Sequence, residues 1–203
     1  MRKIDGPICS RCGFPFPTIA RPAEAGGQRL CASCLSHEPP FTRSRQWGYY
    51  EGTLREAIHK FKYEGKTALA EPLGDWLAAL ASKECHLIIP VPLHKRRLRE
   101  RGFNQSLLLA KRLGRALKLP VDYQSLIRTR PTPPQINLSR EERLRNVRGA
   151  FAIGDRSKVS GRSILLIDDV ITSGATVGEC ARTLLKAGAA SVEVLALARA
   201  VAW

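Results

Sequence analysis

The chain has 203 residues, and its 33 Lys or Arg against 18 Asp or Glu give a formal net charge of +15. A chain of this length can hold one α/β domain with a real core and a small additional module. No apolar run follows Met1, and charged residues interrupt the longest apolar stretches, so we expect a cytoplasmic protein without a secretion signal or a membrane span.

The positive charge is concentrated between residues 94 and 148, which contain fifteen Lys or Arg and four acidic residues. A field of this sign favours polyanionic ligands. A sugar pyrophosphate, a nucleotide and nucleic acid all fit, and charge does not choose among them. The alternative is a solvated basic face that maintains solubility.

Two CxxC pairs near the N-terminus are separated by eighteen residues, and their members are Cys9, Cys12, Cys31 and Cys34. This spacing is typical of a zinc site, and four protein ligands would make the metal structural. Disulfides are the alternative, which conflicts with the lack of an export signal. We therefore predict a zinc-binding module over residues 1–38, a linker over residues 39–48 and a larger domain over residues 49–203.

Two helices should begin the larger domain. A capping-box signature, Thr53-x-x-Glu56, predicts a helix to about Tyr63, and apolar residues at helical spacing predict a second one between Leu69 and Leu80. The aromatic side chains of this region could stack on nucleic-acid bases, although packing in the core is the favoured interpretation. These residues are Trp47, Tyr49, Tyr50, Phe61 and Tyr63.

A basic segment follows the strand that we predict over residues 86–91. Residues 94–103 form an arginine-rich loop in this interpretation, and Asn104 is a suitable N-cap for a helix that continues to Leu117. A guanidinium cluster beside a helix N-terminus suits a phosphorylated ligand. His94 could carry a proton, but an exposed loop histidine is favoured.

A proline-rich loop precedes a short basic helix, which a capping box of Ser139 and Glu142 should begin. Residues 129–139 carry little apolar surface and several charges, so we predict a mobile lid that would exclude water from a reacting centre. A surface loop without ligand contacts is the alternative.

Residues 164–176 are the most informative stretch. Four apolar residues predict a buried strand, Asp168 and Asp169 follow at its C-terminal end, and a loop of hydroxyl and glycine residues leads into a helix ending at Lys186. Such a loop can bind a phosphate while two carboxylates accept hydrogen bonds from vicinal ribose hydroxyls. With a strand over residues 191–197 this predicts a βαβ unit that holds a ribose 5-phosphate. An ordinary helix-capping turn with two surface aspartates is the alternative.

This stretch is similar to the phosphoribosyl-pyrophosphate (PRPP) motif of type I phosphoribosyltransferases. Together with the cysteine pairs, the Val91-Pro-Leu-His and Arg101-Gly-Phe-Asn-Gln segments and the segment from Gln135 to Phe151, it makes nearly the whole chain resemble the ComF family of bacterial competence proteins. The resemblance implies an α/β, type I phosphoribosyltransferase-like domain, with a mostly parallel sheet flanked by helices, joined to the zinc module. It also implies a part in natural competence, in which single-stranded DNA is taken up together with a helicase-like motor and single-strand-processing proteins.

The resemblance also implies how Mg²⁺ and PRPP would be held. Asp168 and Asp169 would be the catalytic pair and bind the ribose hydroxyls. The 5-phosphate would bind the loop residues Thr172, Ser173, Gly174, Ala175 and Thr176. The basic residues expected near the pyrophosphate are Arg96, Arg97 and Arg101.

The reaction itself stays open. Thr172 stands where phosphoribosyltransferases for 6-oxopurines usually carry an acidic residue, and a threonine cannot act as a general base near neutral pH. On an inactive scaffold, the same pocket could bind a nucleotide or the 5′-phosphate end of single-stranded DNA, with the basic segment along the backbone. In a third interpretation the zinc knuckle recruits a protein partner.

Overall fold

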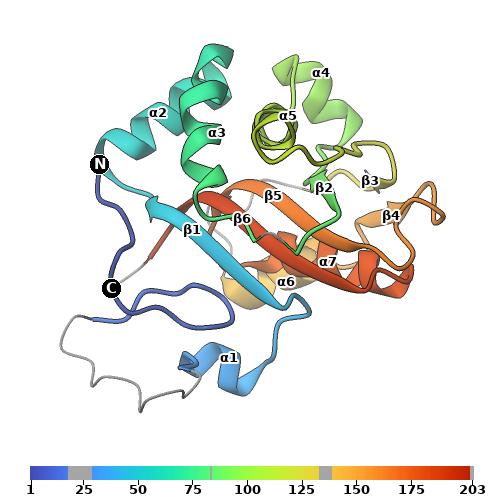
Figure 1. Cartoon of the computed structure of the whole chain (residues 1–203), viewed down its shortest axis with the longest axis horizontal. Helices are drawn as coiled ribbons and strands as arrows, with labels where there is room; N and C mark the ends of the chain where they lie inside the picture. The colour runs from blue at the N-terminus through green and yellow to red at the C-terminus, as the bar shows by residue number, and fades with distance from the viewer. Residues whose placement is uncertain (18–28, 83, 133–138, 202–203) are drawn as a thin grey trace.

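A computed structural model describes residues 1–17, 29–82, 84–132 and 139–201. Its main sheet has four parallel strands in the order β1-β6-β5-β2 (Figure 1). The strands are β1 (Arg43–Tyr49), β2 (Leu87–Pro90), β5 (Ser163–Ile171) and β6 (Ser191–Arg199). Parallel neighbours need crossover connections, which helices supply here.

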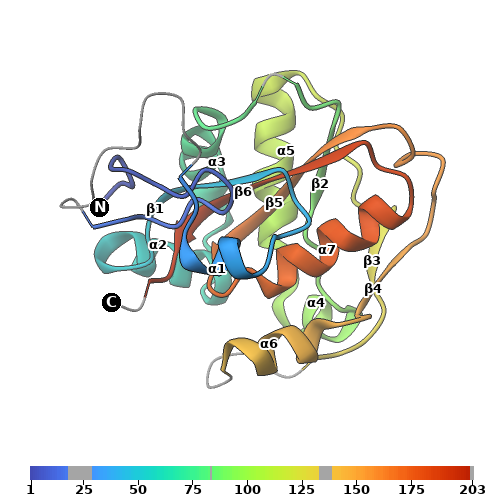
Figure 2. The ribbon, with the colours of Figure 1, turned by 90° about the horizontal axis from the view of Figure 1, so that it is seen from below.

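Helices cover both faces of this sheet, which confirms the predicted α/β class. On one face lie α2 (Gly52–Tyr63), α3 (Ala70–Ala78), preceded by a 3₁₀ turn (Thr67–Leu69), and α5 (Gln105–Leu117). On the other face lie α7 (Ala175–Lys186) and the N-terminal segment with the short α1 (Ala32–Ser36) (Figure 2). None of the helices in the described part of the chain is long and apolar enough to cross a membrane.

Strand β5 sends its side chains alternately into two cores. Ile164 and Leu166 pack with residues of α7 and with the N-terminal cysteines, whereas Leu165 and Ile167 pack with residues of α2, α3 and α5. All four side chains are fully buried. Successive side chains of a strand point to opposite faces of the sheet. The two acidic residues that follow are therefore expected to point in different directions.

Two helix starts confirm the capping residues that the sequence predicts. Asn104 begins α5, where its Oδ1 accepts a hydrogen bond from the amide of Ser106 at 3.0 Å. Ser139 begins α6 (Arg140–Val147) and exchanges hydrogen bonds with Glu142 in a capping box. Both signals act within three residues, so the local sequence is enough to identify them.

Two other expectations for helical segments are wrong. Thr53 does not cap α2, because the N-cap is Glu51, which makes no side-chain capping bond. The basic segment is a helix rather than a loop: α4 spans Lys95–Arg101 and ends at Gly102 in the left-handed conformation (φ 82°). His94 starts it, with Nδ1 accepting a hydrogen bond from a backbone amide at 3.2 Å. Histidine is outside the usual N-cap residues, so the start of α4 carries no standard signal.

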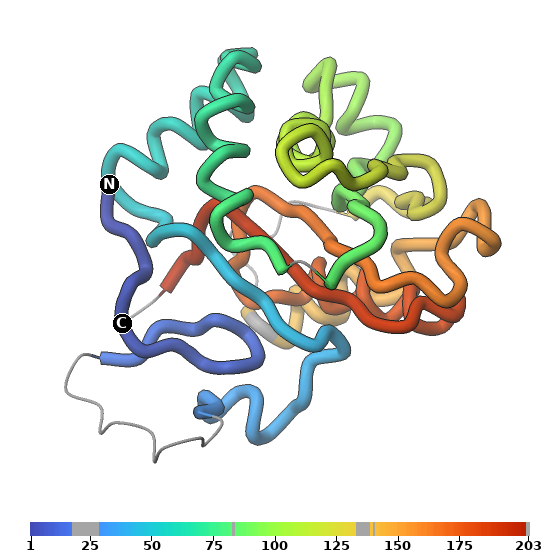
Figure 3. Tube along the Cα trace, in the orientation of Figure 1, coloured from blue at the N-terminus to red at the C-terminus, as the bar shows by residue number. Residues whose placement is uncertain are grey.

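Residues 39–48, which we expected to be a linker, contain all but the last residue of strand β1. Gln46 of β1 lies opposite Ala196 of β6, and its Nε2 donates a 2.6 Å hydrogen bond to Oγ of Ser44. The amide of Ser44 donates to the carbonyl of Arg11 at 2.7 Å, so the N-terminal segment runs beside β1 (Figure 3). Both polar side chains are buried. A strand of this composition lacks the apolar run that normally indicates burial.

A second, two-stranded sheet pairs β3 (Leu126–Arg128) with β4 (Phe151–Ile153) in antiparallel fashion. Helix α6 lies between these strands in sequence and packs against α7. Residues 133–138 of the predicted lid lie outside the described residues. The lid therefore stays a prediction, as does the division of the chain at residues 38 and 48.

Candidate functional site

A small hollow lies where β5 ends and α7 begins. Gly174 adopts the left-handed conformation (φ 79°) that lets the chain turn from the strand into the helix. Oγ of Ser173, the residue before the N-cap Gly174, accepts a hydrogen bond from the amide of Ala175 at 3.3 Å. The residues lining the hollow, of about 20 Å³, are Asp168, Val170, Ile171, Thr172, Gly174, Ala175, Thr176 and Val177. The positive end of the α7 dipole is at this hollow, which favours a phosphate there.

Asp168 is one of the residues that line the hollow. Its Oδ1 accepts hydrogen bonds from Oγ of Ser106, at 3.2 Å, and from the amide of Asp169, at 2.9 Å. Ser106 is held in place because Nδ2 of Asn104 donates to the carbonyl of Val91 at 3.0 Å, which ties the start of α5 to the end of β2. Burial and the neighbouring Asp169 raise the pKa of Asp168 to about 7, although Lys62 opposes this rise.

Asp169 points to a different partner. Its Oδ1 lies 2.8 Å from Nζ of Lys62 on α2, and the Asp169 residue is 3% exposed. Burial disfavours the charge of Lys62, but the attraction of Asp169 and the hydrogen bond between them outweigh this effect and raise the pKa of Lys62. The structure therefore brings one of the two predicted carboxylates to the hollow and directs the other toward α2.

Sequence reasoning missed Lys62, although a signal exists. The buried residues of α2 are Leu54, Ile58 and Phe61. Lys62 follows Ile58 by four positions, so it lies on the same face of the helix as these core residues. A lysine at such a position requires an anionic partner. The sequence of α2 does not show that this partner is Asp169.

The three arginines expected near the pyrophosphate lie on α4 and do not line the hollow. Nε of Arg96 pairs with Oε1 of Glu100 at 2.9 Å. The guanidinium of Arg101 lies over the ring of Tyr63, 5.1 Å from its centroid. Arg97 is close enough to lower the pKa of a further arginine, Arg128.

Arg128 is a further basic side chain that interacts with Asp168. Burial lowers the pKa of Arg128, and the carboxylate of Asp168 opposes this change. Its guanidinium lies over the ring of Phe151 at 5.5 Å. Its Nε is buried and has no hydrogen-bond partner among the residues that the structure describes. A buried donor without a partner in this position is suited to an anionic ligand.

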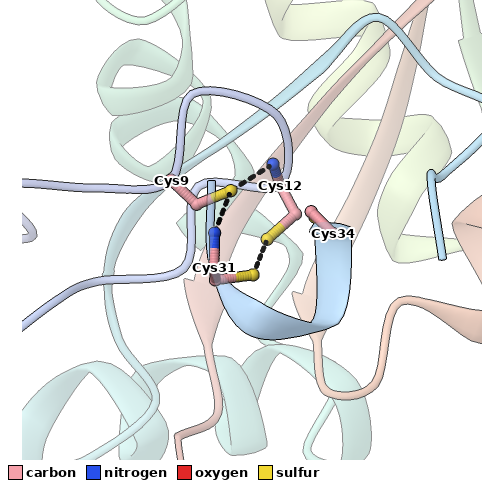
Figure 4. A group of neighbouring side chains, drawn as sticks. All are labelled: Cys9, Cys12, Cys31 and Cys34. Carbon is pink, nitrogen blue, oxygen red and sulfur yellow. Dashed lines mark hydrogen bonds between the residues drawn. The ribbon is translucent and has the colours of Figure 1, made fainter. Parts of the chain in front are cut away.

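The four N-terminal cysteines form a second candidate site, and the structure brings all of them together. Their sulfurs lie within 4.8 Å of one another, and the residues are buried. Sγ of Cys9 accepts hydrogen bonds from the amides of Cys12, at 3.5 Å, and of Cys31, at 3.4 Å (Figure 4). Sγ of Cys12 lies 3.6 Å from Sγ of Cys31. Four converging thiols of this kind can bind a metal such as zinc.

The thiols of the cysteine cluster differ in how readily they ionise. Burial opposes ionisation of Cys9, but backbone hydrogen bonds outweigh it and lower its pKa to about 7. Burial and the neighbouring thiols raise the pKa of Cys34, so the four groups do not ionise together unaided. Four thiolates around a divalent metal carry excess negative charge, and two arginines are near: Arg45 donates to the carbonyl of Ser10, and Arg199 to that of Cys12, both at 3.0 Å.

The chain is similar to known proteins over nearly its whole length. The sequence model of the phosphoribosyl transferase domain family matches residues 104–202. The DNA utilization protein YhgH of Escherichia coli (strain K12) is 36% identical over 205 residues, which cover 97% of this chain and 86% of that protein. The competence protein F of Haemophilus influenzae is 32% identical over 203 residues, covering 96% and 85%.

The chain also matches part of the solved structure of glutamine PRPP amidotransferase from B. subtilis, complexed with ADP and GMP. It is 23% identical, with a TM-score of 0.48, and covers 68% of this chain and 30% of that one. The family assignment rests instead on the relatives, which match nearly the full length. The chain thus belongs to the ComF family of competence proteins and has a phosphoribosyltransferase-type domain, as the sequence resemblance predicts.

Proposed function

We propose that the protein binds Mg²⁺ with PRPP, or a nucleotide, at the hollow between β5 and α7, and that it acts in DNA uptake during competence. The observation that carries the proposal is the joint placement of Asp168 and the phosphate-loop residues around one hollow at the N-terminus of α7. The family match and the names of the two relatives support it. We place the protein in the cytoplasm, where the ligand and incoming single-stranded DNA would both be available.

The ligand would be held by its two charged ends and by its ribose. The 5-phosphate would bind the loop from Thr172 to Thr176, where the α7 dipole favours negative charge. Asp168 would accept a hydrogen bond from a ribose hydroxyl, and Mg²⁺ bound with the ligand would offset part of the phosphate charge. Arg128 and Arg97 are the basic residues best placed for the pyrophosphate, and Arg96 and Arg101 also lie on α4. If transfer occurs, it would depend on positioning and charge stabilisation.

Partners are proposed from the family and from charge. A helicase-like motor and single-strand-processing proteins would deliver single-stranded DNA, and the basic segment of residues 94–148 would favour the DNA backbone. Binding of DNA through this segment should weaken as salt increases, because each neutralised phosphate releases counterions.

A ligand titration monitored by thermal unfolding tests the proposal. Ligand at about a hundred times its dissociation constant adds about 2.7 kcal/mol, which should raise the unfolding midpoint by about 5 to 10 °C in a chain of this size. We expect the shift with Mg²⁺ and PRPP in the wild type, and its loss in Asp168→Asn. Asp5→Asn, which changes an exposed aspartate, is the matched control and should respond as the wild type does. If PRPP causes no shift of the unfolding midpoint in the wild type, and calorimetry also detects no binding, the proposal is overturned.

A further inference from the structure

Lys62 occupies a place on α2 that an apolar side chain would normally hold. Its side chain is 16% exposed, and its Nζ lies 2.8 Å from Oδ1 of Asp169, whose side chain is 5% exposed. Oδ2 of Asp169 is buried without a hydrogen-bond partner in the described parts of the chain. The contact with Lys62 is therefore what compensates the charge of this carboxylate.

The ion pair also changes what a ligand meets at the hollow. Asp168 and Asp169 are neighbours at the end of β5, and two ionised carboxylates there would repel a ligand that carries several phosphate charges. Lys62 cancels one of these charges from the α2 side, while Asp168 lines the hollow at α7. The site then keeps one hydrogen-bond-accepting carboxylate without the full electrostatic cost of two.

We propose that Lys62 is a positioning residue of this site, which holds Asp169 against α2 and leaves Asp168 to accept a ribose hydroxyl. The inference rests on the proposed function. It differs from the arrangement implied by the sequence, in which both carboxylates contact the ribose. Lys62 touches no ligand in this account and acts through the two aspartates.

Lys62 is one of several groups around Asp168 that determine the pH at which its carboxyl group ionises. They are Lys62 from α2, Ser106 from α5, Arg128 from β3, Cys180 from α7 and the adjacent Asp169. Asp169 disfavours ionisation of Asp168, whereas Lys62 and Ser106 favour it. Removal of Lys62 leaves the repulsion between the carboxylates uncompensated. Asp168 then takes up a proton at a higher pH, and a proton on Asp168 removes an acceptor for the ribose.

The first experiment compares Lys62→Met with Lys60→Met by calorimetric titration of Mg²⁺ and PRPP between pH 5.5 and 8.5. Lys60 is exposed on the same helix, so Lys60→Met removes the same charge without breaking the ion pair. We expect Lys62→Met to lose about tenfold in affinity at pH 7 and to shift the acid limb of binding upward by about one pH unit. Lys62→Arg should retain most of the affinity, because it keeps the charge. Equal profiles for Lys62→Met and Lys60→Met would overturn the inference.

A double variant separates positioning from direct contact. Lys62→Met/Asp169→Asn replaces the ion pair by two uncharged side chains, which removes the unpaired buried charge that threatens folding in the single variant. If Asp169 affects binding only through its charge next to Asp168, and does not contact the ligand, the double variant should bind more tightly than Lys62→Met. Its affinity should come within about threefold of that of the wild type. If Asp169 itself holds the ribose, the double variant will bind as poorly as Lys62→Met or worse, and the inference fails.

A ligand-free measurement distinguishes this inference from the proposed function. In protein labelled with ¹³C at the aspartate carboxyls, the signal that Asp168→Asn removes should titrate at a higher pH in Lys62→Met than in Lys60→Met. If the wild type binds no PRPP yet this titration shifts, the proposed function fails while the role of Lys62 in positioning the acids holds. If the titration does not move, Lys62 does not control Asp168, whatever the ligand is.

Discussion

The cysteine cluster and the aspartate pair are both short-range motifs, and the structure uses them in opposite ways. The two CxxC pairs converge until all four sulfurs lie within 4.8 Å of one another. Asp168 and Asp169 are adjacent in sequence, but Asp168 lines the hollow at the start of α7, whereas Asp169 pairs with Lys62 on α2. The difference arises because a tight turn can place two side chains together, whereas a strand sends neighbours to opposite faces. Identical residues at close spacing therefore need not share a role.

The largest effect should come from removing the cysteine ligands. Cys31→Ser/Cys34→Ser should lose bound zinc and the order of the N-terminal segment, since structural zinc contributes about 10 to 16 kcal/mol in zinc-finger peptides. Metal content by atomic absorption, together with limited proteolysis, measures this loss. Cys85→Ala changes a buried cysteine outside the cluster and should keep one zinc per chain. If the double serine variant still binds one zinc per chain, the four cysteines do not act together as the metal site.

The next largest effect tests whether Asp169 is held by Lys62, apart from Asp168. Lys62→Met should destabilise the protein by about 3 kcal/mol, because it leaves the buried carboxylate of Asp169 without a counter-charge. Urea unfolding measures this loss, and Lys60→Met should change the free energy of unfolding little. Lys62→Met/Asp169→Asn should recover much of the lost stability. Equal stability of the two lysine variants would show that the pair does not hold Asp169.

The raised pKa of Asp168 predicts a stability that depends on pH. Its pKa of about 7, against an ordinary value of 3.8, means that the folded state holds the proton more tightly than the unfolded state. The stabilising contribution is therefore full below about pH 4 and is lost as the pH rises through 7. Asp168→Asn removes this titration, so it should be more stable than the wild type at pH 8, by on the order of 2 kcal/mol, and closer to it at pH 5. Urea unfolding at both pH values checks the sign, with Asp5→Asn as a control that should show no such trend.

The smallest effect concerns two glycines of the phosphate loop and α7. Gly174→Ala should cost about 1 kcal/mol, because Gly174 has a left-handed backbone (φ 79°) that disfavours a side chain even though space is open. Gly178→Ala should stabilise α7 by about 0.5 to 1 kcal/mol, since the added carbon meets only Cδ of Pro40, at 3.9 Å. Thermal unfolding of both variants tests the opposite signs. If both variants are less stable than the wild type, the start of α7 has less space for an added carbon at Gly178 than the structure shows.

Two wrong expectations have different causes. Strand β1 is not predicted because its buried residues Ser44 and Gln46 are polar, and the strand is held by β6 and the N-terminal segment, which lie far from it in sequence. Helix α4 is not predicted because its cap, His94, is local but is not a standard N-cap residue. By contrast, the strand, acid and loop order around Asp168 was predicted because each part has its own local signal.

The sequence by itself determined the cysteine spacing, the caps at Asn104 and Ser139, and the order of strand, acids, loop and helix, because these depend on residues only a few positions apart. Only the tertiary structure decided which carboxylate faces the hollow and which one pairs with Lys62. That choice depends on how α2 and α5 pack on β5, through contacts between residues as far apart as Ser106 and Asp168. Such contacts form when the chain folds and buries its apolar faces, and no local pattern encodes the partner that a buried charge will meet.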